Sequence, residues 1–138
     1  MNALVAVPFL FAMAVAAQPP TLSPAQRGIL AAQEQIQKDP KQSQGYNDLA
    51  KALVRRGRES GDPDYYRQAT RAVADSLKAE PDNSKVVDSL FLSVLGRRPR
   101  VGEQKTIARM LSDGSDRADV ARDLFWALLN SKEFVFNH

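Results

Sequence analysis

The chain has one histidine, His138, and an imidazole is the side chain best suited to metal binding or general-base catalysis near neutral pH. A zinc site needs three or four protein ligands, and the sequence has no cysteine and no second histidine to complete a set. Glu133 could join His138 only in a weak surface site. We therefore interpret His138 as a surface or capping residue and as a candidate contact for a protein partner.

Three arginines, Arg97, Arg98 and Arg100, form a basic cluster around Pro99. Guanidinium groups bind phosphates and carboxylates through paired hydrogen bonds, so the cluster could hold an anionic ligand or the carboxylates of a partner. The alternative is pairing with acidic side chains nearby in the fold. The candidates for that pairing are Glu103, Asp119 and Asp123.

The acidic side chains of the C-terminal half do not form a calcium loop. Asp113, Asp116, Asp119 and Asp123 lack the spacing of an EF-hand, and carboxylates at a helix start are explained by the helix dipole. The chain also lacks a glycine-rich phosphate loop, GxSxG and HExxH. We therefore predict a protein that is not an enzyme and that has no cofactor.

Composition excludes several other classes. The net charge is only +3 and basic and acidic residues are interleaved, so nucleic acid is not expected as a partner. The absence of cysteine excludes disulfides, thiolate metal sites and a lipoprotein anchor. A chain of 138 residues is long enough for one domain or two very small ones.

Residues 1–17 are apolar, carry no charged side chain and end in small residues, as a secretory signal peptide does. The apolar run is too short to span a bilayer, which takes about 20 residues. We predict cleavage near Ala17, a linker over 18–23, and a periplasmic or secreted protein. The alternatives are an uncleaved anchor, which would be the chain's one membrane contact, and a wrongly assigned start.

Three helices are predicted in the middle of the chain. Ser23-Pro24 begins a helix over 24–38, a second helix covers about 43–58, and Asp62 caps a third over 64–79. The strings KDPKQ and AEPDN end helices in the same way, 41 residues apart, which suggests an internal repeat.

This middle segment, residues 24–81, resembles one and a half tetratricopeptide repeats, with an insertion over 58–64. The matching residues are Tyr46, Leu49, Ala50, Leu53, Gly57 as the turn glycine, Ala69, Val73, Ser76 and Pro81. In that family the first helix of each repeat lines a binding groove. The resemblance implies that Asn47, Lys51 and Arg55, four residues apart, line such a groove as a polar clamp for an acidic peptide or a carboxylate terminus. The alternative is an ordinary solvated helix face.

Three further helices are predicted after Pro81. The first is capped by Asn83 or Ser84 and stopped by Gly96, the second covers about 102–111, and the third is capped by Ser115. Their inward rows are Val86, Val87, Leu90, Phe91, Val94 and Leu95, then Ile107, Met110 and Leu111, then Val120, Ala121, Leu124, Phe125, Leu128 and Leu129. Trp126 lies beside the last row and is expected to cover an edge of the core or to face the repeat-like half.

Residues 82–138 resemble the end of a planctomycete-type, cytochrome-associated domain of unknown function. The matching residues are Leu95, Arg97 or Arg98, Pro99, Glu103, Trp126 with the rest of 126–131, Glu133, Phe134, Asn137 and His138. The resemblance implies an exported protein, but the CxxCH haem motif of its usual companions is absent. A weaker resemblance links 95–99 and 131–134 to another domain of unknown function in exported bacterial proteins.

Together these patterns predict an all-α fold, a short helical-repeat solenoid capped by a three-helix C-terminal bundle. The predicted function is that of an exported, non-enzymatic adaptor or scaffold that binds another protein or peptide. The alternatives are an accessory subunit or fragment of a larger exported enzyme or cytochrome-associated system, and a homodimer. The predicted protein-binding residues are Asn47, Lys51, Arg55, Arg97, Arg98, Trp126, Phe134, Phe136 and His138.

Overall fold

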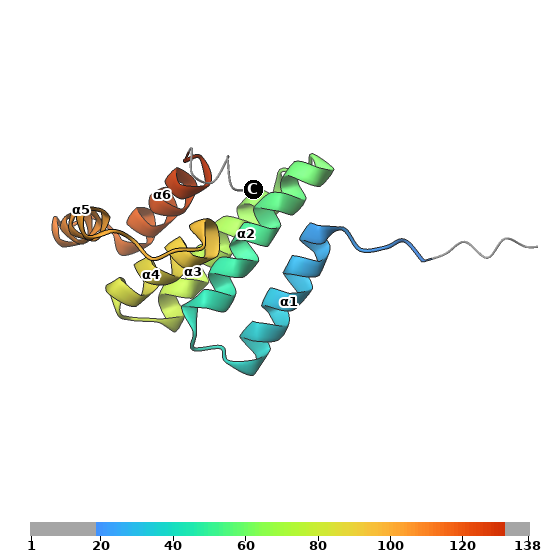
Figure 1. The fold of residues 1–138 in the computed structure, drawn as a ribbon, viewed down its shortest axis with the longest axis horizontal. Helices are drawn as coiled ribbons and strands as arrows, with labels where there is room; N and C mark the ends of the chain where they lie inside the picture. The colour runs from blue at the N-terminus through green and yellow to red at the C-terminus, as the bar shows by residue number, and fades with distance from the viewer. Residues whose placement is uncertain (1–18, 132–138) are drawn as a thin grey trace, which may run out of the picture.

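The computed structural model describes residues 19–131, and within them it contains six α-helices and no strand. The helices are α1 (Pro24–Lys38), α2 (Ser43–Ser60), α3 (Asp64–Ala79), α4 (Asn83–Leu95), α5 (Val101–Ser112) and α6 (Arg117–Leu129) (Figure 1). The prediction of an all-α fold is confirmed. The predicted signal peptide, residues 1–17, lies outside the described residues, as does the segment from 132 onward.

The start of α1 follows the prediction from Ser23-Pro24. Ser23 Oγ accepts from the Gln26 backbone N–H at 3.2 Å, and the Gln26 side chain accepts in return from the Ser23 N–H at 2.8 Å. Two of the amides that a helix start leaves without partners are thereby bonded, and Pro24 has no amide hydrogen to lose.

At three other helix starts the capping residue differs from the prediction. Asp82 rather than Asn83 or Ser84 caps α4, and Asp116 rather than Ser115 caps α6. Both carboxylates accept from two backbone amides, and an ionised acceptor at the positive end of a helix forms the stronger bond. At α3 the cap position is Pro63, while the Asp62 carboxylate accepts from the Asp64 amide at 2.9 Å.

The end of α2 also differs from the prediction. Gly57 lies inside the helix, so it is not a turn glycine, and α2 continues to Ser60. The residue that ends α2 is Gly61, whose φ of 72° is left-handed, as is that of Gly96 after α4. Glycine adopts this conformation without the steric penalty of a side chain, which is why both helices end there.

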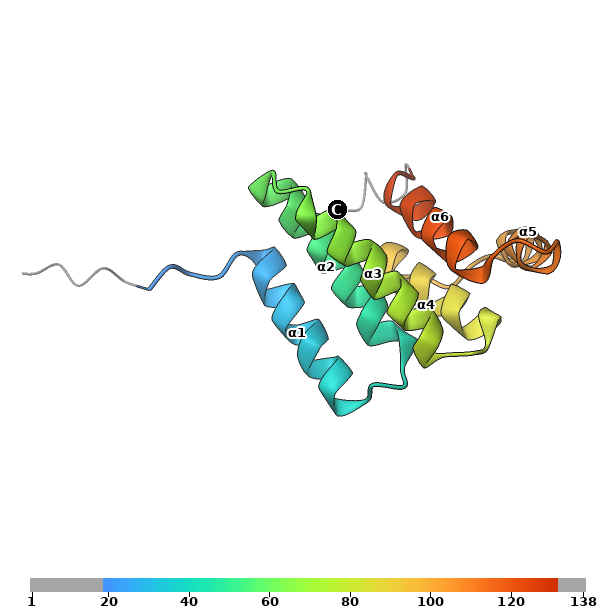
Figure 2. The same cartoon turned by 180° about the vertical axis from the view of Figure 1, so that it is seen from behind.

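The helix α2 is at the centre of the fold. It packs against α1, α3 and α4, whereas α1 has α2 as its one packed neighbour among the described helices. In both views α5 is seen nearly end-on while the other helices lie across the page, so α5 crosses them (Figures 1 and 2). The helix α6 packs on α3 and α4 and so connects the end of the chain to its middle.

The core is formed by α2, α3, α4 and α6, with one fully inward side chain, Ile107, from α5. Its largest fully buried side chains are Phe91, Phe125, Leu90 and Leu129. Met110 was expected to face inward, but it is 41% exposed, because α5 crosses its neighbours and presents only a narrow face to them. A helix with one buried anchor gains little packing energy, so α5 is the least firmly held of the six.

Candidate functional site

Asn47 lies inside the fold and not on a groove face. Its side chain is fully buried between α2 and α4, where its amide donates a hydrogen bond to Ser89 Oγ. Ser43, one turn earlier, donates to the same hydroxyl at 2.9 Å. The prediction that Asn47 lines a groove together with Lys51 and Arg55 is therefore wrong, because α4 covers the side of α2 that carries Asn47.

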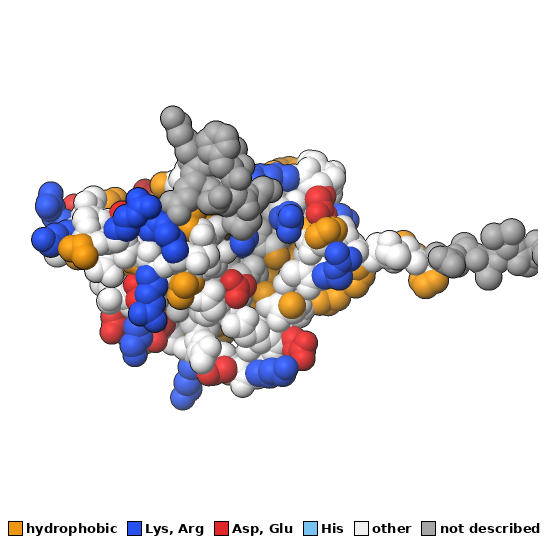
Figure 3. All heavy atoms as spheres, viewed as in Figure 1, with side chains coloured by type: hydrophobic (Ala, Val, Ile, Leu, Met, Phe, Trp, Pro, Cys, Tyr) orange, Lys and Arg blue, Asp and Glu red, His pale blue; other side chains and the backbone are white. Residues whose placement is uncertain are grey.

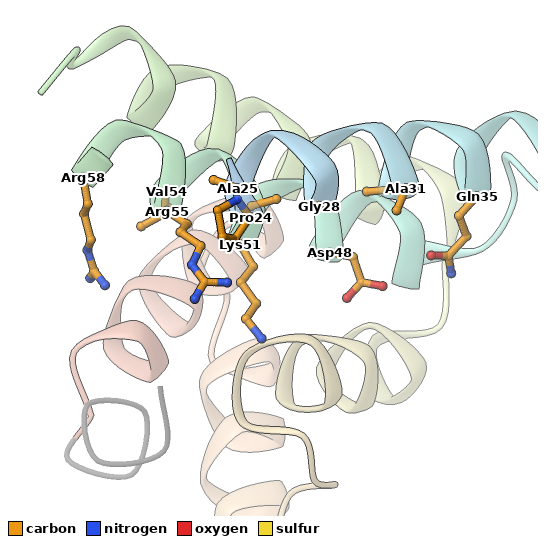
Figure 4. A pocket seen from close by; sticks show the side chains of 12 residues that line it. Pro24, Ala25, Gly28, Ala31, Gln35, Asp48, Lys51, Val54, Arg55 and Arg58 are labelled. Carbon is orange, nitrogen blue, oxygen red and sulfur yellow. The ribbon is translucent and has the colours of Figure 1, made fainter. Parts of the chain in front are cut away.

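Lys51 and Arg55 do line a groove, between α1 and α2. The cavity measures about 640 Å³. Figure 4 shows the side chains of Lys51, Arg55 and Arg58 leaving α2 on the same side, with Asp48 near the other end of the row. The helix α1 forms the opposite wall with mainly small side chains, among them Ala25, Gly28, Ala31 and Ala32.

Three contacts along α1 and α2 fix the two walls relative to each other. At one end Ser23 Oγ donates to the Glu59 carboxylate at 2.6 Å. Near the middle, a Cβ added at Gly28 would lie 3.2 Å from the Ala52 Cβ, so the helices approach closely there.

At the other end of the pair, Gly45 packs on Ile36. A Cβ added at Gly45 would lie 3.0 Å from Ile36 Cγ1. Because the pair is held at both ends and near the middle, the groove is a preformed feature of the fold, as most binding clefts are.

The charge along the groove is mainly positive. The lining contains three cationic side chains, those of Lys51, Arg55 and Arg58, and one carboxylate, that of Asp48. The Asp48 carboxylate accepts from the Gln44 side-chain amide at 3.1 Å. Burial lowers the pKa of Lys51; Asp48 acts against this effect and Arg55 adds to it. A carboxylate of a ligand placed beside this row would favour the charged form of Lys51, and so would offset both its desolvation and its repulsion from Arg55.

No protein-family model, curated protein or solved structure matches this chain. The chemistry of the groove is therefore the basis on which a function can be assigned.

Two parts of this site are absent from the sequence prediction. Arg58 extends the row of cations by one further turn, seven residues after Lys51, and could have been found by continuing the same helical spacing. The small residues Ala25, Gly28 and Ala32 recur at intervals of three and four along α1, which is a signal for a close helix approach.

Arg97 is engaged within the fold. Its guanidinium forms two bonds to the Glu103 carboxylate, at 2.9 and 3.0 Å, and lies 5.4 Å from the centre of the Phe91 ring. The alternative of local pairing is confirmed for Glu103. It is wrong for Asp119 and Asp123, which pair with Arg122 at 2.9 and 3.6 Å.

This ion pair also closes the start of α5. The Glu103 carboxylate accepts from the Arg100 backbone amide at 2.7 Å, and its hydrogen bonds to Arg97 lower the pKa of Glu103 to about 2. We assign Arg97 a role in holding α5. Of the two arginines predicted to bind a partner, Arg97 and Arg98, only Arg98 is exposed to solvent.

Trp126 faces α3, in the middle segment of the chain, which was one of its two predicted positions. Its ring lies 6.1 Å from that of Tyr66 in α3 and 5.5 Å from that of Phe125. The partly buried Trp126 therefore connects α6 to α3 and is not an exposed anchor. The other predicted anchors, Phe134, Phe136 and His138, lie outside the described residues.

The face seen in Figure 3 is mixed in charge, with Lys and Arg side chains interspersed with Asp and Glu. Within residues 19–131 no three His, Asp or Glu side chains are grouped so that they could hold a metal ion. None of the helices described there is both long enough and apolar enough to cross a bilayer.

Proposed function

We propose that this protein is an exported, non-enzymatic helical adaptor that binds another protein through the groove between α1 and α2. The observation that supports this most directly is the row Lys51, Arg55 and Arg58 facing a wall of small side chains in a preformed cavity. Such a surface complements a partner segment that combines acidic and apolar residues.

The proposal includes the architecture suggested by the sequence. In it, α1 to α3 form a short repeat unit resembling tetratricopeptide repeats, and α4 to α6 cover the end that such a unit leaves open. Repeat units contact only their neighbours, so a short array needs a cap on its apolar face. The packing of α4 on α2 and of α6 on α3 supports this role.

The test is direct binding of a labelled acidic peptide to the full-length chain. We expect a peptide of Glu and Ala to bind at low ionic strength and to weaken as salt is added. The double variant Lys51→Glu/Arg55→Glu should lose at least tenfold in affinity. The control variant Lys105→Glu/Arg109→Glu changes the same charge on the exposed side of α5 and should bind as the wild type does.

Two results would count against the proposal: a wild-type chain that binds no acidic peptide, or a groove variant that binds as well as the control variant. Export is tested separately, by fusing residues 1–23 to a reporter enzyme that is active only outside the cytoplasm. We expect activity from this fusion and none from a fusion in which Leu10 and Phe11 are replaced by Asp.

A further inference from the structure

The walls of the groove determine which backbone conformation a ligand can adopt in it. An extended peptide carries one unbonded donor and one unbonded acceptor per residue, which a binding surface must satisfy or leave to water. The wall formed by α1 is mainly apolar, with Ala25, Gly28, Ala31 and Ala32, and the polar side chain that lines it is that of Gln35, at one end. The backbone groups in the interiors of α1 and α2 are already used within the helices.

A helical ligand avoids this cost because its backbone groups bond to one another. It also fits the shape of the site: Ala25 and Ala32 are buried against α2, but the exposed Ala31 and the half-buried Gly28 are small and let a second helix approach closely. The helix α1 packs only against α2 among the described helices, so a further helix could lie beside both. The aliphatic stems of Lys51 and Arg55 would then cover its flank while their charged ends reach its carboxylates.

The spacing of the charged residues gives the pattern such a helix should carry. Asp48, Lys51, Arg55 and Arg58 follow each other at intervals of three, four and three, which places them along one stripe of α2. A partner helix lying alongside presents its own stripe at the same intervals. Its charges should be opposite, with a basic residue facing Asp48 and acidic residues facing the three cations.

We propose that the groove between α1 and α2 binds an amphipathic α-helix of a partner protein, in which one basic residue and three acidic residues follow one another at intervals of three, four and three. This inference rests on the proposed function and specifies the partner. It predicts that the ligand becomes helical on binding and that its carboxylates, and not its backbone, contact α2.

Three labelled peptides of one composition, each made in both chain directions, test this. The first carries Lys and three Glu at the matched intervals in an Ala-rich background. The second has the same residues with the Glu moved to the opposite helix face. The third keeps the matched intervals but carries a Pro at its centre, where the first two peptides carry it at the end. Affinity for the full-length chain is measured by fluorescence anisotropy, and helix formation by circular dichroism.

We expect the matched peptide to gain helix on binding and to bind at least tenfold more tightly than the other two, with that advantage lost in Lys51→Glu/Arg55→Glu. If the peptide with the central Pro binds as tightly as the matched one, the helical partner is refuted while the adaptor function stands. If none of the three binds, both fail. A concentration-dependent dimer in sedimentation that Arg55→Glu abolishes would assign the groove to a second copy and overturn the inference.

Discussion

The side-chain amide of Asn47 in α2 donates a hydrogen bond to the Ser89 hydroxyl in α4, and both residues are buried. Ser89 accepts a second bond from Ser43 and itself donates to the Val86 carbonyl at 3.1 Å. Within the described part of the chain, Asn47 Oδ1 is buried without a hydrogen-bond partner. The contact between α2 and α4 therefore contains a polar seam inside an otherwise apolar core.

This seam predicts how the two residues are coupled. Ser89→Ala leaves the buried Asn47 amide without its acceptor and should lower the free energy of unfolding by about 1–3 kcal/mol. In Asn47→Leu/Ser89→Ala the Asn47 amide is gone as well, and the Ser43 hydroxyl is left as the group that has lost its acceptor, so part of that loss should be recovered. Urea unfolding measures both, with Ser84→Ala at the exposed start of α4 as the control. Additive losses in the double variant would contradict the coupling.

The Asn47 side chain also illustrates the limit of prediction from sequence. Helix positions follow from local signals: both ends of α3, Asp64 and Ala79, are found because Pro63 and Pro81 flank them. Which neighbour covers each stripe of α2 is decided by contacts across more than 40 residues, such as that between Asn47 and Ser89. A helical spacing places Asn47 near Lys51, but it does not show that one is buried by α4 while the other lines the groove.

For the same reason, only one wall of the groove, that formed by α2, could be predicted from the sequence. Lys51 and Arg55 were found from their spacing on one helix, which is local information. The opposite wall belongs to α1, and its role depends on the close approach of Gly28 to Ala52; the small-residue spacing on α1 signals such an approach but does not specify which helix makes it.

The ion pair between Arg97 and Glu103 predicts a pH dependence of stability. The pKa of Glu103 in the folded state, about 2, is lower than the ordinary value of 4.5, so the ionised carboxylate stabilises the fold above about pH 4.5 and this contribution is lost as pH falls toward 2. The Glu103 side chain is 34% exposed, so solvent screening reduces the contribution to about 1–2 kcal/mol.

Glu103→Gln should therefore be less stable than the wild type at pH 7, and the difference should shrink at pH 4 and again at pH 3. Urea unfolding at the three pH values measures it. Glu34→Gln removes the acid of an exposed pair with Lys38 and should have no measurable effect. A difference for Glu103→Gln that stays constant between pH 7 and pH 3 would show that the charge of Glu103 is not its source.

Two helical glycines predict opposite responses to the same change. In Gly57→Ala the new Cβ would lie 3.0 Å from a Tyr66 ring carbon and 3.3 Å from the Tyr65 Cβ, so the contact between α2 and α3 must open, at a cost of about 1–3 kcal/mol. In Gly102→Ala the new Cβ meets no atom within 4 Å apart from its chain neighbours and the backbone of its own helix, and the better helix former should stabilise α5 by about 0.5 kcal/mol. Thermal unfolding of the two variants compares them; a loss of stability in both would contradict the packing argument.

Arg117, at the start of α6, connects three elements through one guanidinium. It donates to the Leu77 carbonyl at 2.9 Å and to the Glu80 carbonyl at 2.6 Å, both at the end of α3, and it also contacts the Asn83 side chain. Carbonyls at the end of a helix lack partners within the helix, so Arg117 satisfies two of them.

Arg117→Lys keeps the charge but not the planar fork of donors, so the ammonium cannot reproduce the geometry of these bonds. We expect a loss of about 1–3 kcal/mol in the free energy of unfolding, and faster hydrogen exchange in α6 than in α2, since α6 would separate from α3 first. Arg122→Lys changes an arginine of the same helix that pairs only on the exposed surface with Asp119 and Asp123, and it should match the wild type. Equal stability of the two variants would mean that the packing of Trp126 on Tyr66 is sufficient to hold α6 against α3.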